Sequence, residues 1–266
     1  MDILTILVIV GVIAIIGLKL FYRKQEISQQ ELAKEFPEQW RQILMKKATF
    51  YANLNKTDRK QFEHRVLHFL NTKLIEGVET DIDDTIKLLV AASAIIPSFA
   101  FPNYNYPMVR TILIYPGSFN ERYQTVSDKQ GELPVIGMVD NRSQNGSTII
   151  FSKSALLASF SGIPDRNNVG IHEFVHLLDK EDGEIDGVPE ALLERQYVGP
   201  WLREIKDQMK EIERGKSDIN PYALTNNAEF LAVASEYFFD HPEKFRRKHP
   251  ELYEHLSEIF NKHDAS

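Results

Sequence analysis

Two histidines and a glutamate, His172, Glu173 and His176, have the HExxH spacing of a metal site. Histidines four residues apart on a helix lie about 40° apart around its axis, so both imidazoles can reach one ion. A glutamate directly after the first histidine can hold a water beside that ion and act as a general base. The spacing predicts a catalytic metal site, and zinc is the ion that paired imidazoles suit best. The alternative is an ordinary amphipathic helix whose histidines are satisfied by hydrogen bonds.

The segment around the motif has independent signals of a helix. Three residues that can cap a helix start precede it, namely Asp165, Asn167 and Asn168. Within the segment, Ile171, Val175 and Leu178 fall at positions i, i+4 and i+7 and form an apolar stripe beside the histidines. We therefore expect a helix with one face in the core and the other face lining a cleft.

The third metal ligand is open on spacing alone, because a catalytic zinc ion normally has three protein ligands. A third histidine six residues after the second is excluded, since that position is Asp182. Asp179 lies on the histidine face and could be a ligand, although a carboxylate so close along one helix more naturally holds an imidazole in place. Two further candidates, Glu229 and Glu236, lie seven residues apart on one face of a mostly apolar helix over 226–239.

Both of these glutamates also have ordinary explanations. Asn226 and Glu229 fit the capping-box pattern approximately, and Glu236 could make a buried hydrogen bond or salt bridge. Burying a carboxylate is costly unless the group is paired or bound to a metal, so each of them needs a partner. Spacing does not decide which of the two completes the site.

Several segments, in order along the chain, resemble the Mlc titration factor A family of zinc peptidases. They are His172–Asp179, Gly187-Val188-Pro189, Asn220-Pro221-Tyr222-Ala223, Ala228-Glu229-Phe230 and Ser235-Glu236-Tyr237-Phe238-Phe239. The similarity extends from about Phe36 to the final helix, which is most of the chain. The family's fold is similar to the zincin catalytic domain of a bacterial toxin protease, so the resemblance implies an α+β, zincin-like metallopeptidase domain.

The resemblance also implies roles for five residues. His172, His176 and Glu229 would bind one zinc ion per chain. Glu173 would be the catalytic base, and Tyr222 would donate a hydrogen bond to the transition state. Soluble members of the family bind the glucose repressor Mlc, so a transcriptional regulator is an implied partner beside a peptide or protein substrate.

The N-terminal stretch 3–22 is apolar apart from Thr5 and Lys19 and, at about 20 residues, can span a hydrocarbon core of about 30 Å. A cleaved signal peptide usually begins with a basic region, whereas the only charge before this stretch is Asp2. Lys19, Arg23 and Lys24 all lie on its C-terminal flank. By the positive-inside rule we predict a single-pass anchor in the cytoplasmic membrane with the catalytic domain in the cytoplasm. Members of the family are usually soluble, so the anchor is a departure from them.

Composition narrows the classes of function. The formal net charge of -7 argues against a general nucleic-acid binder, and the absence of cysteine excludes thiolate catalysis and disulfides. The apolar fraction of 43% is sufficient for a substantial core. We predict residues 1–24 as the transmembrane anchor with its basic flank and 25–266 as the metallopeptidase domain, with a helical part over about 25–105 and a catalytic part over about 106–266.

A coarse reading of the chain predicts a mainly helical domain with a small sheet. We expect helices over about 37–54, 58–75, 83–95, 192–216 and 226–239, besides the motif helix. Strands are expected at 110–115, 135–139 and 148–152 from their β-branched residues, with Asn145-Gly146 as a hairpin turn. The apolar stretch 88–96 is too short to cross a bilayer and should be core.

Three functions are compatible with these observations. The leading hypothesis is a membrane-anchored zinc metallopeptidase. The second is a regulatory protein that sequesters a transcription factor or other partner, with the zinc site secondary; an intact Glu173 argues against a purely structural zinc, which needs no base. The third is metal-assisted hydrolysis of a non-peptide amide or ester.

Overall fold

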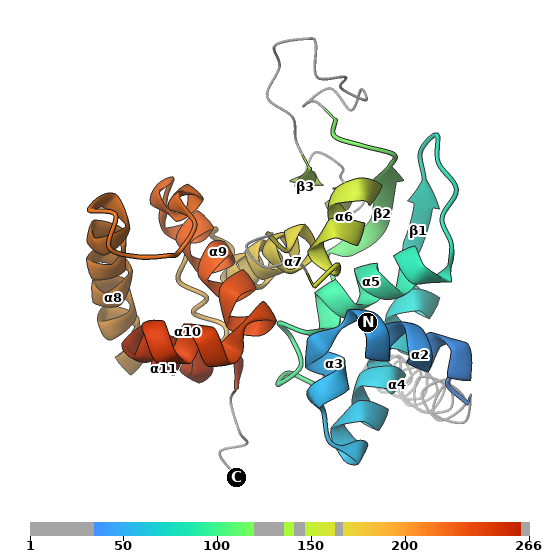
Figure 1. Cartoon of the computed structure of the whole chain (residues 1–266), viewed down its shortest axis with the longest axis horizontal. Coiled ribbons are helices and arrows are strands. Elements are labelled where there is room, and N and C mark those ends of the chain that lie inside the picture. The colour runs from blue at the N-terminus through green and yellow to red at the C-terminus, as the bar shows by residue number, and fades with distance from the viewer. Residues whose placement is uncertain (1–34, 120–135, 141–146, 163–166, 262–266) are drawn as a thin grey trace, which may run out of the picture. The chain divides into compact units, whose positions relative to one another are not determined.

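The computed structural model describes residues 35–119, 136–140, 147–162 and 167–261 (Figure 1). The predicted anchor at 1–24 and the predicted Asn145-Gly146 turn lie outside the described residues. The chain divides into two compact units, Met1–Pro37 and Glu38–Ser266. Of the helices in the described ranges, none combines the length and the apolar character needed to cross a membrane.

The second unit is mostly helical and contains a small mixed sheet, as predicted in outline. Its helices are α2 (Glu38–Lys47), α3 (Thr49–Asn53), α4 (Lys56–Thr72), α5 (Asp84–Ile95), α6 (Lys153–Ser159), α7 (Val169–Asp179), α8 (Arg195–Glu213), α9 (Asn227–Asp240), α10 (Pro242–Lys248) and α11 (Pro250–Phe260), with short 3₁₀ turns η1 (Lys180–Asp182) and η2 (Pro221–Leu224). Its strands are β1 (Leu74–Gly77), β2 (Val109–Tyr115), β3 (Gly137–Asp140) and β4 (Ser147–Ser152).

The sheet has the strand order β1-β2-β4-β3. Strand β2 pairs in parallel with β1 and with β4, whereas β3 and β4 pair antiparallel, as the predicted hairpin requires. The three predicted strands are confirmed with small shifts at their ends.

The predicted helix over 58–75 is wrong at its C-terminal end. Helix α4 ends at Thr72, Lys73 adopts an extended conformation, and the next four residues form β1. The Lys73 ammonium donates to the carbonyl oxygens of Tyr106 and Val109 at 2.7 and 2.9 Å, which ties this turn to the start of β2. Pairing with β2, a contact far along the chain, therefore outweighs the local helical pattern.

The predicted helix over 37–54 is divided in two. Ala48 has extended dihedral angles (φ −104°, ψ 97°) between α2 and α3, and its side chain is buried. Alanine is the best helix former, so local propensity gives no reason for a break there. The sequence pattern carries no information about the tertiary packing of this buried residue.

Helix α5 is the central element of the core. Its residues from Leu88 to Ile95 are buried, which confirms the prediction that this apolar stretch is core. Helix α7 approaches α5 closely at Gly170, where a Cβ atom would lie 2.0 Å from Oγ of Ser93. Because only a glycine allows this approach, Gly170 sets where the motif helix lies against the core.

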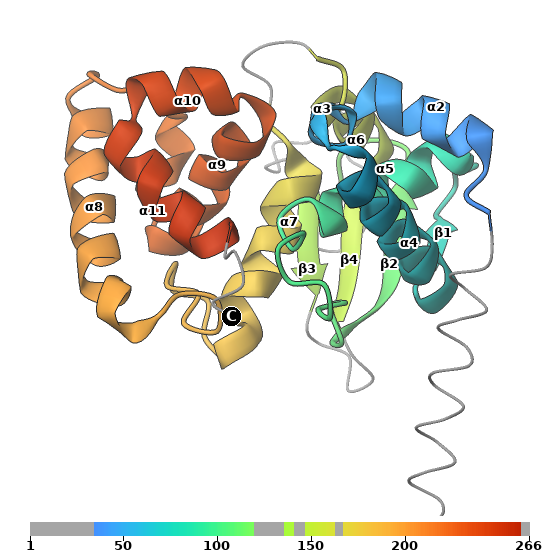
Figure 2. The same cartoon turned by 90° about the horizontal axis from the view of Figure 1, so that it is seen from below.

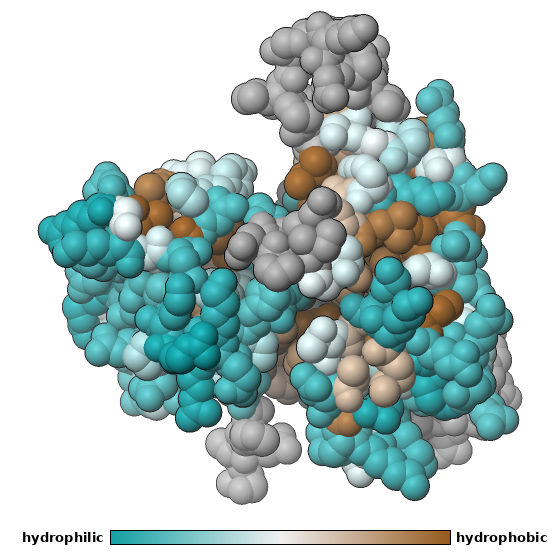
Figure 3. Space-filling model, viewed as in Figure 1, coloured by the Kyte–Doolittle hydropathy of each residue, from teal (hydrophilic) through white to brown (hydrophobic). Residues whose placement is uncertain are grey.

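Helix α7 lies between the sheet with its helices and the C-terminal helices α8–α11 (Figures 1 and 2). The predicted helix 192–216 is confirmed as α8, whose buried side chains are Trp201, Ile205 and Ile212. Figure 3 shows mostly hydrophilic residues over the outer side of these C-terminal helices and hydrophobic residues at the surface around α5 and β1. The many charges of α8 are thus on a solvated face.

Candidate metal centre

Helix α7 begins directly after Asn168, one of the three residues predicted as a possible cap. The side chain of Asn168 accepts a hydrogen bond from the backbone N–H of Ile171 and is the N-cap. Ile171, Val175 and Leu178 are buried, which confirms the predicted apolar stripe. The side chains of His172 and His176 remain 14% and 13% exposed, so the histidine face borders solvent instead of the core.

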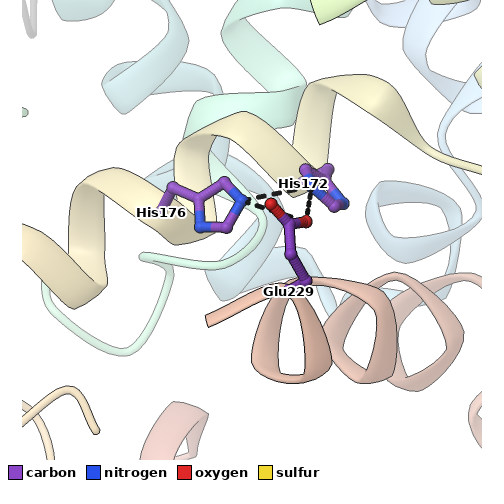
Figure 4. Close-up of side chains that lie close together, drawn as sticks. All are labelled: His172, His176 and Glu229. Carbon is purple, nitrogen blue, oxygen red and sulfur yellow. Dashed lines mark hydrogen bonds and ion pairs between the residues drawn. The ribbon is translucent and has the colours of Figure 1, made fainter. Parts of the chain in front are cut away.

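Helix α9 brings a carboxylate to these histidines. Its N-cap Asn226 accepts from the backbone N–H of Glu229, which confirms half of the predicted capping box. The Glu229 side chain does not complete the box; its carboxylate faces the two imidazoles of α7 (Figure 4). The capping geometry thus fixes the backbone of the first turn and leaves the carboxylate for the site.

Three potential ligand atoms converge. Nε2 of His172 lies 3.2 Å from Nε2 of His176, and Oε2 of Glu229 lies 3.0 and 3.5 Å from these two nitrogens. Tetrahedral ligands at about 2.0–2.1 Å from a zinc ion lie roughly 3.3 Å from one another. His172, His176 and Glu229 therefore fit a divalent metal ion.

The other glutamate of α9 lies behind the site. Oε1 of Glu236 lies 2.7 Å from Nδ1 of His172, and its other oxygen accepts the backbone N–H of Asn168. A carboxylate at Nδ1 keeps the proton there and leaves the lone pair of Nε2 free for a metal. Glu236 thus orients one imidazole and also accepts a hydrogen bond from the backbone N–H at the start of α7.

Asp179 has a different position from the one expected. Its side chain is buried, and Oδ2 accepts the backbone N–H of Gly187 at 2.8 Å. Among the described hydrogen bonds, Glu236 and not Asp179 holds an imidazole. Burial raises the pKa of Asp179 to about 6, although the Gly187 N–H lowers it.

Gly187 connects three helices around the site. Beside its bond to Asp179 on α7, its carbonyl accepts from the indole N–H of Trp201 on α8 at 2.6 Å. It has φ +80°, and a Cβ atom there would lie 2.3 Å from the carbonyl oxygen of Asn227, two residues before Glu229. Gly187 is part of the motif segments above, but the reason for a glycine there was not visible in the sequence.

Electrostatics couple the three ligand candidates. Burial lowers the pKa of His172, but hydrogen bonds to Glu229 and Glu236 outweigh it and raise the pKa to about 10. Burial raises the pKa of Glu229, but the two histidines more than reverse this and lower it to about 2. The carboxylate of Glu229 is therefore ionised at neutral pH, which is the form that can ligate a cation.

The two other predicted site residues border this triangle. Glu173 is 8% exposed, and burial raises the pKa of its carboxyl although the nearby histidines lower it. The ring of Tyr222, on η2, lies 6.1 Å from the ring of His172 and is 51% exposed. Burial and the charges of Glu229 and Glu173 raise the pKa of Tyr222, so its hydroxyl keeps the proton that a donor needs.

Comparison with known proteins shows the family. A family model described as glucose-regulated metallo-peptidase M90 matches residues 21–261. An uncharacterized protein of Synechocystis sp. is 28% identical over 246 residues, which cover 90% of this chain and 88% of the relative. Mlc titration factor A of Klebsiella pneumoniae is 25% identical over 223 residues, 79% of this chain and 81% of the relative. The same protein of Cronobacter sakazakii is 30% identical over 162 residues, 56% of this chain and 58% of the relative. These matches confirm the resemblance, and the chain belongs to the glucose-regulated metallo-peptidase M90 family.

Proposed function

We propose that the protein is a zinc-dependent metallopeptidase, with His172, His176 and Glu229 as metal ligands, Glu173 as general base and Tyr222 as hydrogen-bond donor. The observation that carries this proposal is the convergence of two imidazole nitrogens and one carboxylate oxygen, 3.0 to 3.5 Å apart, beside a buried glutamate. A purely structural site would not need a base and would favour four protein ligands.

The residues supply the proton transfers of hydrolysis. A bound zinc ion supplies a Lewis acid that polarises the scissile carbonyl and lowers the pKa of the attacking water. Glu173 removes a proton from that water as it attacks and then delivers a proton to the leaving amine. Burial raises the pKa of Glu173, which makes its carboxylate a stronger base. Tyr222 donates to the oxyanion that forms on the carbonyl oxygen.

The end strand of the sheet supports an extended peptide as the substrate. The carbonyl of Ile136 accepts from Ser152 N–H, and β3 pairs with β4 in the register Gly137↔Phe151. In this antiparallel ladder the main-chain groups of alternate residues face β4, so those of Gly137 and Val139 face the opposite side. A peptide in extended conformation can pair with these groups next to α7.

We also propose that the enzyme is tethered to the membrane, with its catalytic domain on the cytoplasmic side. The support is the apolar stretch 3–22 with basic residues on its C-terminal flank. The family model matches from residue 21, so nearly all of this stretch precedes the matched region.

The test uses the full chain in detergent. It measures the metal content of the protein and its hydrolysis of a peptide library with and without a chelator. We expect about one zinc ion per chain, hydrolysis that a chelator stops and zinc restores, and no cleavage of simple esters at a comparable rate. Glu173→Gln should keep the metal and lose at least about 10³-fold in kcat, because general-base catalysis contributes up to about 10⁴-fold. Equal hydrolysis by wild type and Glu173→Gln contradicts the mechanism.

A second function is favoured by the name of the relatives, Mlc titration factor A, which describes binding to Mlc. A regulatory protein of this kind would sequester a transcriptional regulator, with the metal site secondary. Pull-down of the regulator by wild type, Glu173→Gln and metal-free protein separates the two functions. Binding by all three forms together with no peptidase activity would favour sequestration.

A further inference from the structure

Gly137 on β3 faces the motif helix. The neighbouring residue of the strand, Met138, packs on the opposite side of the sheet against the cluster of Tyr115, Phe119 and Ile150. Side chains alternate along a strand, so position 137 points toward α7. Glycine in a strand interior weakens the strand and commonly marks a close approach by another group.

Two side chains of α7 approach Gly137, those of Val169 and Glu173. A Cβ atom at position 137 would lie 2.7 Å from Oε1 and 3.0 Å from Cγ of Glu173, and 2.5 Å from Cγ2 of Val169. Cβ atoms of real proteins do not come this close to other heavy atoms, so something would have to shift. Val169 is a short, buried side chain in the first turn of α7, whereas the glutamate carboxylate is the end of a longer and more flexible one.

We propose that Gly137 is a positioning residue for Glu173. Its bare backbone provides the space in which the carboxylate lies beside both the metal ligands and the main-chain groups of β3 that face a peptide substrate. Any side chain at 137 displaces the carboxylate while leaving the strand's N–H and C=O groups in place. This inference rests on the proposed peptidase function, in which Glu173 is the base.

The kinetic test compares Gly137→Ala with Gly117→Ala. Gly117 is the matched control, because a Cβ atom there would meet no described atom within 4 Å and its φ is not positive. We expect Gly137→Ala to lower kcat about 100-fold, the loss typical of a misplacement of about 1 Å, with KM changed less than about threefold. Zinc content should stay at the wild-type value. Gly117→Ala should behave as wild type.

A stability measurement tests the contact without any activity. Melting temperatures are measured for wild type, Gly137→Ala, Glu173→Ala and the double variant. Gly137→Ala should lower the melting temperature, and part of this loss should disappear in the Glu173→Ala background, because the Glu173 atoms that would clash are gone while the contact with Val169 remains. Should Gly137→Ala fail to fold, the same comparison is made in a Val169→Ala background, which removes the other close contact.

The outcomes separate the two proposals. Equal losses of melting temperature in both backgrounds overturn the proposed contact. A coupled loss of stability with kcat kept within about threefold, or a loss confined to KM or zinc content, overturns the positioning role. If neither wild type nor Gly117→Ala hydrolyses any peptide, the proposed function fails, while the stability comparison still decides whether Gly137 holds Glu173.

Discussion

Nδ1 of His172 lies 2.7 Å from Oε1 of Glu236, while Nε2 of the same ring lies 3.0 Å from Oε2 of Glu229. Both carboxylates belong to α9 and are two helical turns apart. One imidazole is therefore held between two carboxylates, and the nitrogen beside Glu229 is the one proposed to bind the metal. The second histidine, His176, has no such partner at Nδ1 among the described residues. Of the two histidines proposed as ligands, His172 is therefore the one whose ring is held at both nitrogens.

Replacing Glu236 by glutamine should weaken metal binding. Both oxygens of Glu236 accept hydrogen bonds, one from His172 and one from the backbone of Asn168. A glutamine has only one acceptor oxygen, so its NH₂ group must face one of these donors. We expect zinc affinity to fall about 10- to 100-fold, the usual effect of losing the partner of a ligating histidine. Competition with a chelating dye measures the affinity.

Glu254→Gln is the control for this change, because Glu254 is an exposed residue of α11. It should bind zinc as wild type does. Unchanged zinc affinity in Glu236→Gln would show that Glu236 matters only as the acceptor for the backbone N–H of Asn168.

Replacing Tyr222 by phenylalanine should slow turnover without weakening substrate binding. The half-exposed ring lies beside His172, and its hydroxyl remains protonated at neutral pH. Removal of one oxyanion donor typically lowers kcat about 10²- to 10³-fold. Steady-state kinetics should show this loss with KM nearly unchanged. Tyr253→Phe on α11 is the control and should retain full activity; a Tyr222→Phe variant with wild-type kcat would remove Tyr222 from the mechanism.

Replacing Gly187 by alanine should weaken both the fold and the metal site. The residue has φ +80°, and a Cβ atom would lie 2.3 Å from the backbone of Asn227 at the start of α9. Gly215→Ala is the matched control, because Gly215 has φ +67° but nothing near its Cβ position among the described atoms. Left-handed strain alone costs about 1–2 kcal/mol, and the clash should raise the loss in Gly187→Ala to about 3 kcal/mol or more.

Urea unfolding measures this difference, and a zinc titration follows it. Because Asn227 is two residues before Glu229, only Gly187→Ala should also lose zinc affinity. Equal losses of stability in the two variants would mean that the close approach to α9 is not maintained in solution.

Asp240 should make the stability depend on pH. Burial raises its pKa to about 7 from the ordinary 3.8, although the amide of Asn168 lowers it. The folded state thus binds this proton more tightly than the unfolded state, so the contribution is fully present below about pH 4 and is lost as pH rises through 7. Asp240→Asn keeps an oxygen for Asn168 and removes the titration.

The unfolding free energy of Asp240→Asn, relative to wild type, should therefore rise by about 2–4 kcal/mol between pH 5 and pH 8. Urea unfolding of both proteins in chelator at the two pH values provides the comparison. A difference that is the same at both pH values would show that Asp240 does not titrate in this range.

Local patterns were sufficient for the elements that carry the site. The spacing of His172 and His176, the cap at Asn168 and the apolar stripe of α7 are properties of neighbouring residues, and the structure places them as predicted. The core position of α5 follows for the same reason, since an apolar run of that length has few alternatives in a folded domain. The strand β1 was missed because its pairing with β2 joins segments far apart in the chain.

The sequence by itself determined that α7 presents two imidazoles on one face and that α9 presents two carboxylates on one face. It did not determine which carboxylate meets which nitrogen; only the resemblance to a known family singled out Glu229. That choice depends on how α9 lies against α7, with Glu229 near both histidines and Glu236 near His172 and Asn168. Close approaches such as that of Gly187 to Asn227 help to place the start of α9, and such contacts between distant residues exist only in the folded chain.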